Sequence, residues 1–179
     1  SFAGERFLPV RILDYASIDA RGYIEGFYGG WTHDQRKSLM EFTRDIKMNI
    51  YVYASKTDPY HTSKWAELYP DEMIGEFREL TALQEEMKCE FSWSVHLTNM
   101  LSGITSTTDP RYEERKQQLM DKFDQLYEIG VRRFCILNDD FGSGSNEVVV
   151  SLINDLNEEY VGPKGCENII YCPQGYNNS

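Results

Sequence analysis

The sequence contains few histidines, cysteines and basic residues, which are the residues that commonly bind zinc, form disulfides and bind polyanions. Its three histidines, His33, His61 and His96, are not spaced as zinc ligands usually are, so no metal site is predicted from them. The four cysteines include no C-x-x-C pair, which favours buried free thiols over a disulfide or a metal role. Basic residues are also scarce, because 18 Lys and Arg face 29 Asp and Glu, for a formal charge of -11. This charge disfavours nucleic acid and anionic lipid and suits a neutral partner better.

Long apolar runs are absent as well. None approaches the ~20 residues of a membrane-spanning helix, so no membrane span is predicted. The N-terminus has no basic region followed by an apolar run, although an excised piece of a longer protein could have lost such a signal. The sequence therefore does not indicate in which cellular compartment the protein acts. With 179 residues and 41% hydrophobic content, the chain is long enough for one globular domain.

Strand-like and helix-like segments alternate from about residue 22 onward. Helices are expected to start at the capping box Thr32-His33-Asp34-Gln35, at Asp71, after Asp109-Pro110 and after Ser145. Five apolar runs have strand composition: residues 22–27, 49–54, 89–95, 132–138 and 168–172. This order predicts an α/β fold with a parallel sheet, either an open doubly wound sheet or part of an eight-fold barrel. Residues 1–20 do not fit the rhythm and are expected to be the tail of a preceding domain, a linker, or a strand beneath the barrel.

Two adjacent carboxylates follow the fourth predicted strand, and both architectures carry their ligand sites beyond the carboxyl ends of strands. Asp139 and Asp140 are too close to ionise together easily, which provides an acid and an anion at neutral pH, as glycoside hydrolysis requires. A helix cap, a solvated acidic turn and a Mg²⁺ site are the alternatives. If Asp139 points inward, then Cys135 and Leu137 do so too, which leaves Phe134 and Ile136 to meet the helices.

Two further positions lie at predicted strand ends. Lys56 comes just after the second strand, where a lone lysine is usually solvated. Gly26 closes the first strand, and a glycine there either lets a ligand approach the backbone closely or forms the turn before the helix.

Four separated motifs carry a resemblance to a known family. They are Arg21–Gly29 (RGYIEGFYG), Tyr53–His61 (YASKTDPYH), Gly130–Phe134 (GVRRF) and the pair Asp139-Asp140. The sequence resembles glycoside hydrolase family 84, which contains the O-GlcNAcases and bacterial β-N-acetylglucosaminidases, some historically called hyaluronidases. The resemblance extends from about Arg21 to Tyr176.

The resemblance implies a (β/α)8 TIM barrel and a retaining, substrate-assisted mechanism that removes terminal β-linked N-acetylglucosamine from a glycan or glycoprotein through an oxazoline. By motif, Asp139 would polarise the acetamido N–H, and Asp140 would be the general acid and then the base. Gly26 and Lys56 match positions that hold sugar hydroxyls, and Tyr176 matches a tyrosine near the reacting centre. The resemblance implies no cofactor. A bacterial member would be secreted or on the cell surface, and a eukaryotic one cytoplasmic or nuclear.

Length sets one further expectation. A closed barrel needs eight strands and ~250 residues, whereas only about the first five βα units are visible here. Residues 21–179 are therefore predicted to be the N-terminal part of a catalytic barrel whose remainder is missing from this chain, and this piece alone is expected to be inactive or nearly so. The alternatives are a carbohydrate-binding or interaction module without catalysis and, from another class, a metal-dependent phosphatase or regulator that uses both aspartates as ligands.

Overall fold

The computed structural model describes residues 15–139 and 145–175, and its strands form a single parallel sheet. Their order is the order of the sequence, since every strand pairs with the one before it. The strands are β1 (Gly22–Ile24), β2 (Ile50–Tyr53), β3 (Glu90–His96), β4 (Phe134–Leu137) and β5 (Ile170–Cys172). A doubly wound sheet reverses its order at a switch point, and the described strands contain no such reversal. The predicted α/β fold with a parallel sheet is confirmed.

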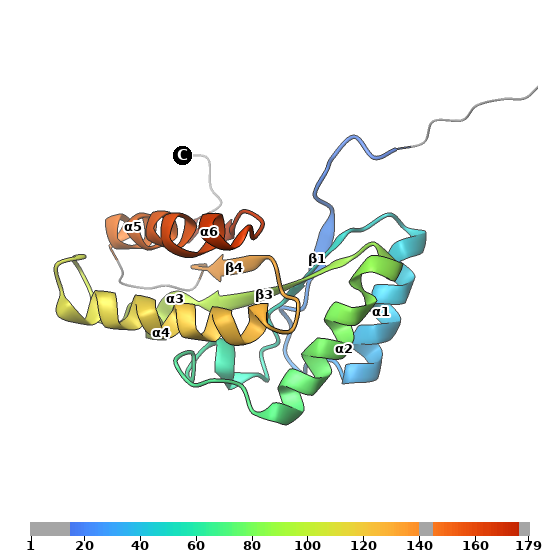
Figure 1. Ribbon diagram of the computed structural model, residues 1–179, viewed down its shortest axis with the longest axis horizontal. Helices are drawn as coiled ribbons and strands as arrows, with labels where there is room; N and C mark the ends of the chain where they lie inside the picture. The colour runs from blue at the N-terminus through green and yellow to red at the C-terminus, as the bar shows by residue number, and fades with distance from the viewer. Residues whose placement is uncertain (1–14, 140–144, 176–179) are drawn as a thin grey trace, which may run out of the picture.

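Helices connect successive strands, and neighbouring helices pack side by side, α1 against α2 and α4 against α5 (Figure 1). The longer ones are α1 (His33–Asp45), α2 (Asp71–Met87), α4 (Pro110–Tyr127) and α5 (Asn146–Leu156). Shorter segments are the 3₁₀ turn η1 (Pro59–His61), α3 (Leu97–Met100), the π-helical turn η2 (Asn157–Val161) and α6 (Gly162–Lys164). This layout brings the carboxyl ends of all five strands to one edge of the sheet.

The predicted helix starts are confirmed. Thr32 caps α1 in a full capping box, because its hydroxyl accepts from the amide of Gln35 and the Gln35 side chain accepts from the amide of Thr32. Asp109 caps α4, with Pro110 at the first helical position. These caps therefore determine the residue at which each loop ends and the helix begins.

Leu39, Phe42 and Ile46 recur in the sequence at helical spacing, but they do not form the buried face of α1. Phe42 is 56% exposed and Ile46 is also exposed, whereas Met40 and Arg36 are buried. Arg36 turns inward because it forms an ion pair with the fully buried Glu25, at 2.8 Å. A charge that lies deep in the structure thus sets the rotation of this helix.

The two faces of the sheet differ in character. One face carries large side chains that join the core beneath the helices: Tyr51, Tyr53, Phe91, Trp93, Phe134 and Ile136. The other carries small and aliphatic side chains and lines a hollow of about 360 Å³: Gly22, Ile24, Ile50, Val52, Cys135, Leu137, Ile170 and Cys172. The edge strands β1 and β5 both line this hollow, so the sheet curls toward a half-barrel. The expectation that Cys135 and Leu137 face inward, with Phe134 and Ile136 toward the helices, is confirmed.

None of the four cysteines, all of which lie in the described ranges, forms a disulfide. Cys89 and Cys135 are buried, and burial raises the pKa of the Cys135 thiol to about 12. Cys166 and Cys172 are half-buried. The two buried thiols are therefore parts of the core.

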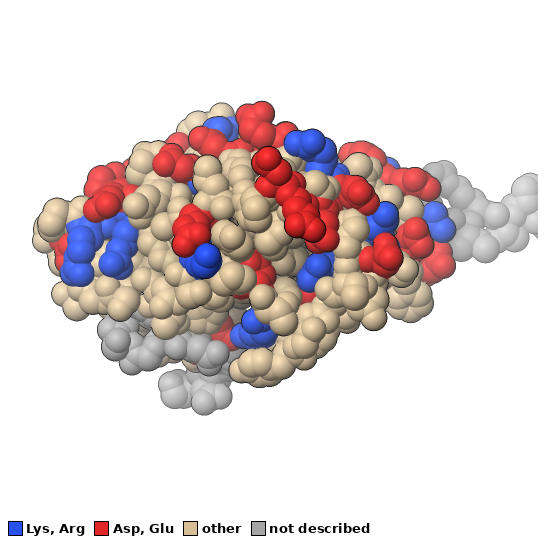
Figure 2. Space-filling model, turned by 90° about the horizontal axis from the view of Figure 1, so that it is seen from below, with Lys and Arg blue, Asp and Glu red and all other residues tan. Residues whose placement is uncertain are grey.

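On the face that Figure 2 shows, acidic and basic side chains are interspersed among the other residues, and acidic ones are prominent. Among the described residues, no Asp, Glu, Lys or Arg lines the inner hollow. None of the described helices has the length and apolar character to cross a membrane.

Candidate functional site

Asp139 lies at the carboxyl end of β4, where the chain has just left the sheet. The amide of the preceding Asn138 still donates to the carbonyl of Cys172 at 2.9 Å, so the strand pairing holds up to the site. The Asp139 side chain is 37% exposed, but its Oδ1 atom is buried and accepts no hydrogen bond from any described residue. Asp140 and Tyr176, the other predicted residues near the reacting centre, lie outside the described residues.

His96, the last residue of β3, stands beside Asp139. Its Nε2 atom is 3.4 Å from Asp139 Oδ1, and the residue is only 8% exposed. His96 was not among the site residues predicted from the sequence. The signal available was its place at the end of the third predicted strand, level with the strand end that precedes Asp139.

His61, in η1, connects the end of β3 to the loop after β2. Its Nε2–H donates to the carbonyl of Ser55 at 2.9 Å. Burial lowers the pKa of His61, and the nearby His96 and Lys56 act in the same direction while Asp58 opposes them. His61 is therefore close enough to interact electrostatically with both Lys56 and His96. His33 is elsewhere, 3.0 Å from Glu79.

Lys56 is exposed at the carboxyl end of β2, in a loop that is shaped by Asp58. Asp58 is buried, and its carboxylate accepts from the amide of Tyr60 at 2.7 Å. It also accepts from the hydroxyls of Tyr69 at 2.7 Å and Tyr53 at 3.1 Å. These bonds fix the backbone that presents Lys56.

A second buried charge supports the same loop from α4. Lys122 is fully buried and donates to the carbonyl of Tyr60 at 2.5 Å and to that of Lys64 at 3.3 Å. Its ammonium group lies 4.9 Å from the Tyr69 ring centre and 5.7 Å from that of Trp93. Burial lowers the pKa of Lys122 to about 7. A lysine on a polar helix gives no sequence signal of this role.

Gly26 is exposed at the carboxyl end of β1, and packing does not require a glycine there. An added Cβ atom would have only Ile24 Cγ1 nearby, at 3.8 Å. The preceding Glu25, in contrast, is held by the Arg36 guanidinium, the Tyr51 hydroxyl and the Trp31 amide. Burial alone would raise the pKa of Glu25, but these donors outweigh it and hold the pKa below its usual range. The exposed Gly26 thus directly follows a buried residue, Glu25, that hydrogen bonds hold in place.

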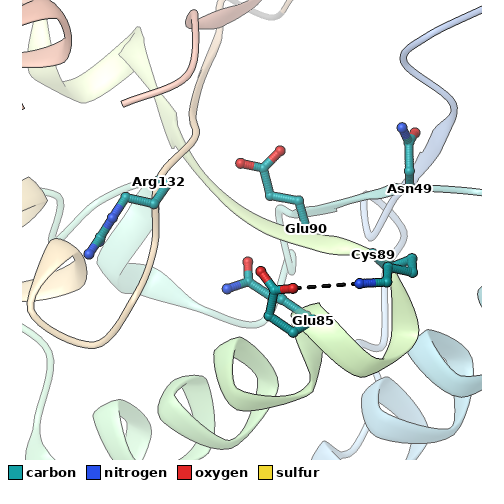
Figure 3. Close-up of a pocket in the computed structure, with 7 residues that line it drawn as sticks. Asn49, Glu85, Cys89, Glu90 and Arg132 are labelled. Atoms are coloured by element: carbon teal, nitrogen blue, oxygen red, sulfur yellow. Dashed lines mark ion pairs between the residues drawn. The ribbon is translucent and has the colours of Figure 1, made fainter. Parts of the chain in front are cut away.

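A different pocket lies at the opposite edge of the sheet, where the strands begin (Figure 3). Asn49 and Glu90 line it from the amino ends of β2 and β3, and Arg132 lines it from just before β4. Lys88 pairs there with Glu85 at 3.6 Å. Sites in parallel α/β proteins are built from the loops at the other edge, so we assign this pocket no part in the site.

Within the described ranges, no three His, Cys, Asp or Glu side chains gather closely enough to hold a metal ion. The site there consists of one carboxylate beside an imidazole, with an exposed lysine and an exposed glycine on the neighbouring loops. It can accept a hydrogen bond at Asp139 and donate from Lys56.

Comparison with known proteins decides what this arrangement belongs to. A family model for β-N-acetylglucosaminidase (NAGidase) matches residues 21–179. The chain belongs to the β-N-acetylglucosaminidase family. It is 30% identical over 168 residues to protein O-GlcNAcase of Rattus norvegicus and, equally, to that of Mus musculus. The match covers 87% of this chain but only 17% of each relative.

Solved structures of this β-N-acetylglucosaminidase family have the same fold. CpGH84D superposes with a TM-score of 0.84 at 37% identity, over 93% of this chain and 28% of that one. CpGH84B gives 0.78 at 31% identity, over 88% and 28%. A mutant O-GlcNAc hydrolase of Thermobaculum terrenum gives 0.76 at 27% identity, over 90% and 36%. The predicted membership of glycoside hydrolase family 84 is confirmed, and the chain spans well under half the length of these relatives.

Proposed function

We propose that the protein containing this chain removes terminal β-linked N-acetylglucosamine by substrate-assisted catalysis. The observation that carries the proposal is the position of Asp139, at the carboxyl end of β4 on the rim of a curled parallel sheet in a β-N-acetylglucosaminidase family chain. The net charge of -11 favours a neutral glycan over an anionic one.

Asp139 accepts the N–H of the substrate's 2-acetamido group in this mechanism. The hydrogen bond increases electron density on the acetamido carbonyl oxygen, which attacks the anomeric carbon and forms an oxazoline. Asp140 donates its proton to the glycosidic oxygen as the bond to the anomeric carbon breaks. It then takes a proton from the water that opens the oxazoline, so the configuration is retained. The protein supplies no covalent nucleophile, unlike most retaining glycosidases.

The other predicted residues bind the sugar. Lys56 is exposed on a loop that buried bonds hold in place, and its ammonium can donate to sugar hydroxyls. Gly26 offers open backbone at the end of β1. Tyr176 follows β5 and is proposed to face the reacting centre.

The curled sheet fits the first part of an eight-stranded barrel. Its inner hollow is lined by both edge strands, and three further strands between β5 and β1 would enclose it. Loops after those strands would complete the sugar pocket.

The test is hydrolysis of a chromogenic β-N-acetylglucosaminide by the full-length gene product that contains this chain. Asp140→Asn is expected to lower kcat by on the order of 100-fold or more, because it removes the general acid and base. Asp139→Asn is expected to lower kcat and to weaken binding of an oxazoline mimic. The matching β-glucoside, which lacks the acetamido group, should be a very poor substrate.

The remaining outcomes separate the alternatives. Binding of N-acetylglucosamine without hydrolysis would favour the non-catalytic carbohydrate-binding module. Loss of activity when metal ions are chelated would favour the alternative of a metal-dependent phosphatase or regulator. Hydrolysis of the β-glucoside at a comparable rate would exclude substrate assistance.

A further inference from the structure

The His96 side chain is on the inner face of the sheet, the face that also carries the proposed site. Along β3, Phe91, Trp93 and Val95 belong to the core beneath the helices, so the alternate residues face the inner side. His96 is one of these alternate residues, and it lies opposite Leu137 in the strand register. Asp139 follows Leu137 by two residues, and its Oδ1 atom is 3.4 Å from Nε2 of His96.

The second nitrogen of His96 determines which way its proton points. Nδ1 accepts from the amide of Thr98 at 3.5 Å and lies 2.9 Å from the Thr98 hydroxyl. A backbone amide can only donate, so Nδ1 is unprotonated in this arrangement and the neutral ring carries its proton on Nε2. Nε2 is the atom that faces Asp139 Oδ1.

Capping of the short helix α3 accounts for only half of this geometry. His96 is its N-cap residue, and that role uses Nδ1 alone. The direction of Nε2 toward a buried carboxylate oxygen that has no hydrogen-bond donor among the described residues is left unexplained by the cap. Such an oxygen is costly unless a donor reaches it.

We infer that His96 is a positioning residue for Asp139, an inference that rests on the proposed function. Its Nε2–H donates to Asp139 Oδ1 when substrate is bound, and the Thr98 contacts hold the ring in this tautomer. Catalytic hydrogen bonds are often long in the unliganded state and shorten in the complex, which fits the present 3.4 Å. With one carboxylate oxygen held by His96, the other is left to accept the acetamido N–H.

The experiment compares His96→Leu with His96→Gln in the full-length protein. Leucine fills the space without a donor, whereas the glutamine amide restores an N–H at a similar reach. His96→Leu is expected to lower kcat on the order of 10- to 100-fold with little change in KM, since a hydrogen bond to a charged group contributes about that factor. His96→Gln should recover most of the loss. His33→Leu, on the outer side beside Glu79, is the matched control and should leave activity unchanged.

A double-mutant cycle with Asp139→Asn provides a readout that a purely structural role would not move. If His96 acts through Asp139, His96→Leu costs little further activity in the Asp139→Asn background. Additive losses, or a His96→Gln variant as impaired as His96→Leu with unchanged thermal stability, would overturn the inference. If the wild type is active and His96→Leu is equally active, the inference about His96 is wrong and the proposed function stands. If the wild type is inactive, the proposed function itself is wrong.

Discussion

Single charged residues buried beneath the loops do much to shape this protein. Glu25 and Arg36 form an ion pair in the interior below Gly26, and Lys122 lies below the loop that carries Lys56. Burying a charge is costly unless it is paired or hydrogen-bonded, and breaking such a contact typically costs several kcal/mol. These residues therefore hold the loops rigidly enough to present exposed groups.

Lys122 should make stability depend on pH. Burial lowers its pKa from 10.5 to about 7, so between these values the unfolded chain binds more protons than the folded one. The free energy of unfolding then rises with pH through this window, and below about pH 7 Lys122 contributes no further pH dependence because it is protonated in both states. Relative to Lys122→Met, the wild type should gain up to about 1.4 kcal/mol per pH unit between pH 7 and 10.

Chemical denaturation at several pH values measures this difference. Lys64→Met, a half-exposed lysine of the same loop, serves as the control and should show a nearly constant offset from the wild type. A difference between the wild type and Lys122→Met that stays flat across the window would mean that Lys122 keeps its proton in the folded state.

At the scale of elements, the loop after β1 rests on the loop after β2. Gly30 has φ +57°, and a Cβ atom there would lie 2.6 Å from Thr57 Oγ1 and 3.0 Å from Ser55 Oγ. Both contacts flank Lys56. The short distance therefore couples the first loop of the site to the second.

Gly30→Ala is expected to push the Lys56 loop outward and raise KM several-fold for the chromogenic substrate. Gly29→Ala is the matched control, because Gly29 also has a positive φ, +108°, but no atom of the described residues lies within 4 Å of an added Cβ. Both variants should lose roughly 1–2 kcal/mol of stability from backbone strain. Equal KM values for the two would show that the contact with Thr57 does not position Lys56.

The elements were largely predictable, and the packing beneath them was not. Capping residues such as Thr32 and Asp109 act locally, so the sequence indicates them directly. The inward parity of Cys135 also follows from simple alternation. The rotation of α1 depends on an ion pair between Glu25 and Arg36 that only the folded chain brings together. His96 was missed for the same reason, since its partner Asp139 is 43 positions away and on another strand.

At the scale of the whole molecule, the curled sheet leaves its inner face without a covering layer among the described residues. The hollow of about 360 Å³ has a mostly apolar lining, to which both edge strands, β1 and β5, contribute. In the proposed barrel, these two strands are separated by the strands that complete the wall.

The 179-residue chain alone is expected to hydrolyse the chromogenic β-N-acetylglucosaminide at no more than about one hundredth of the full-length rate, because a pocket with missing walls cannot orient the acetamido group. Parallel kinetics on the two proteins, with circular dichroism to verify folding of the shorter one, measure this ratio. Rates within a few-fold of each other would mean that the first five strands already form a complete pocket.

The sequential strand order also bears on how the chain is made. Each described strand from β2 to β5 pairs with the strand synthesised immediately before it, so none of these four pairings needs a partner that is made later. On the ribosome the sheet can grow by one βα unit at a time, and the newest strand is always the open edge. Translation and assembly then proceed in the same direction, and Asp139 can reach His96 only once the fourth strand has emerged.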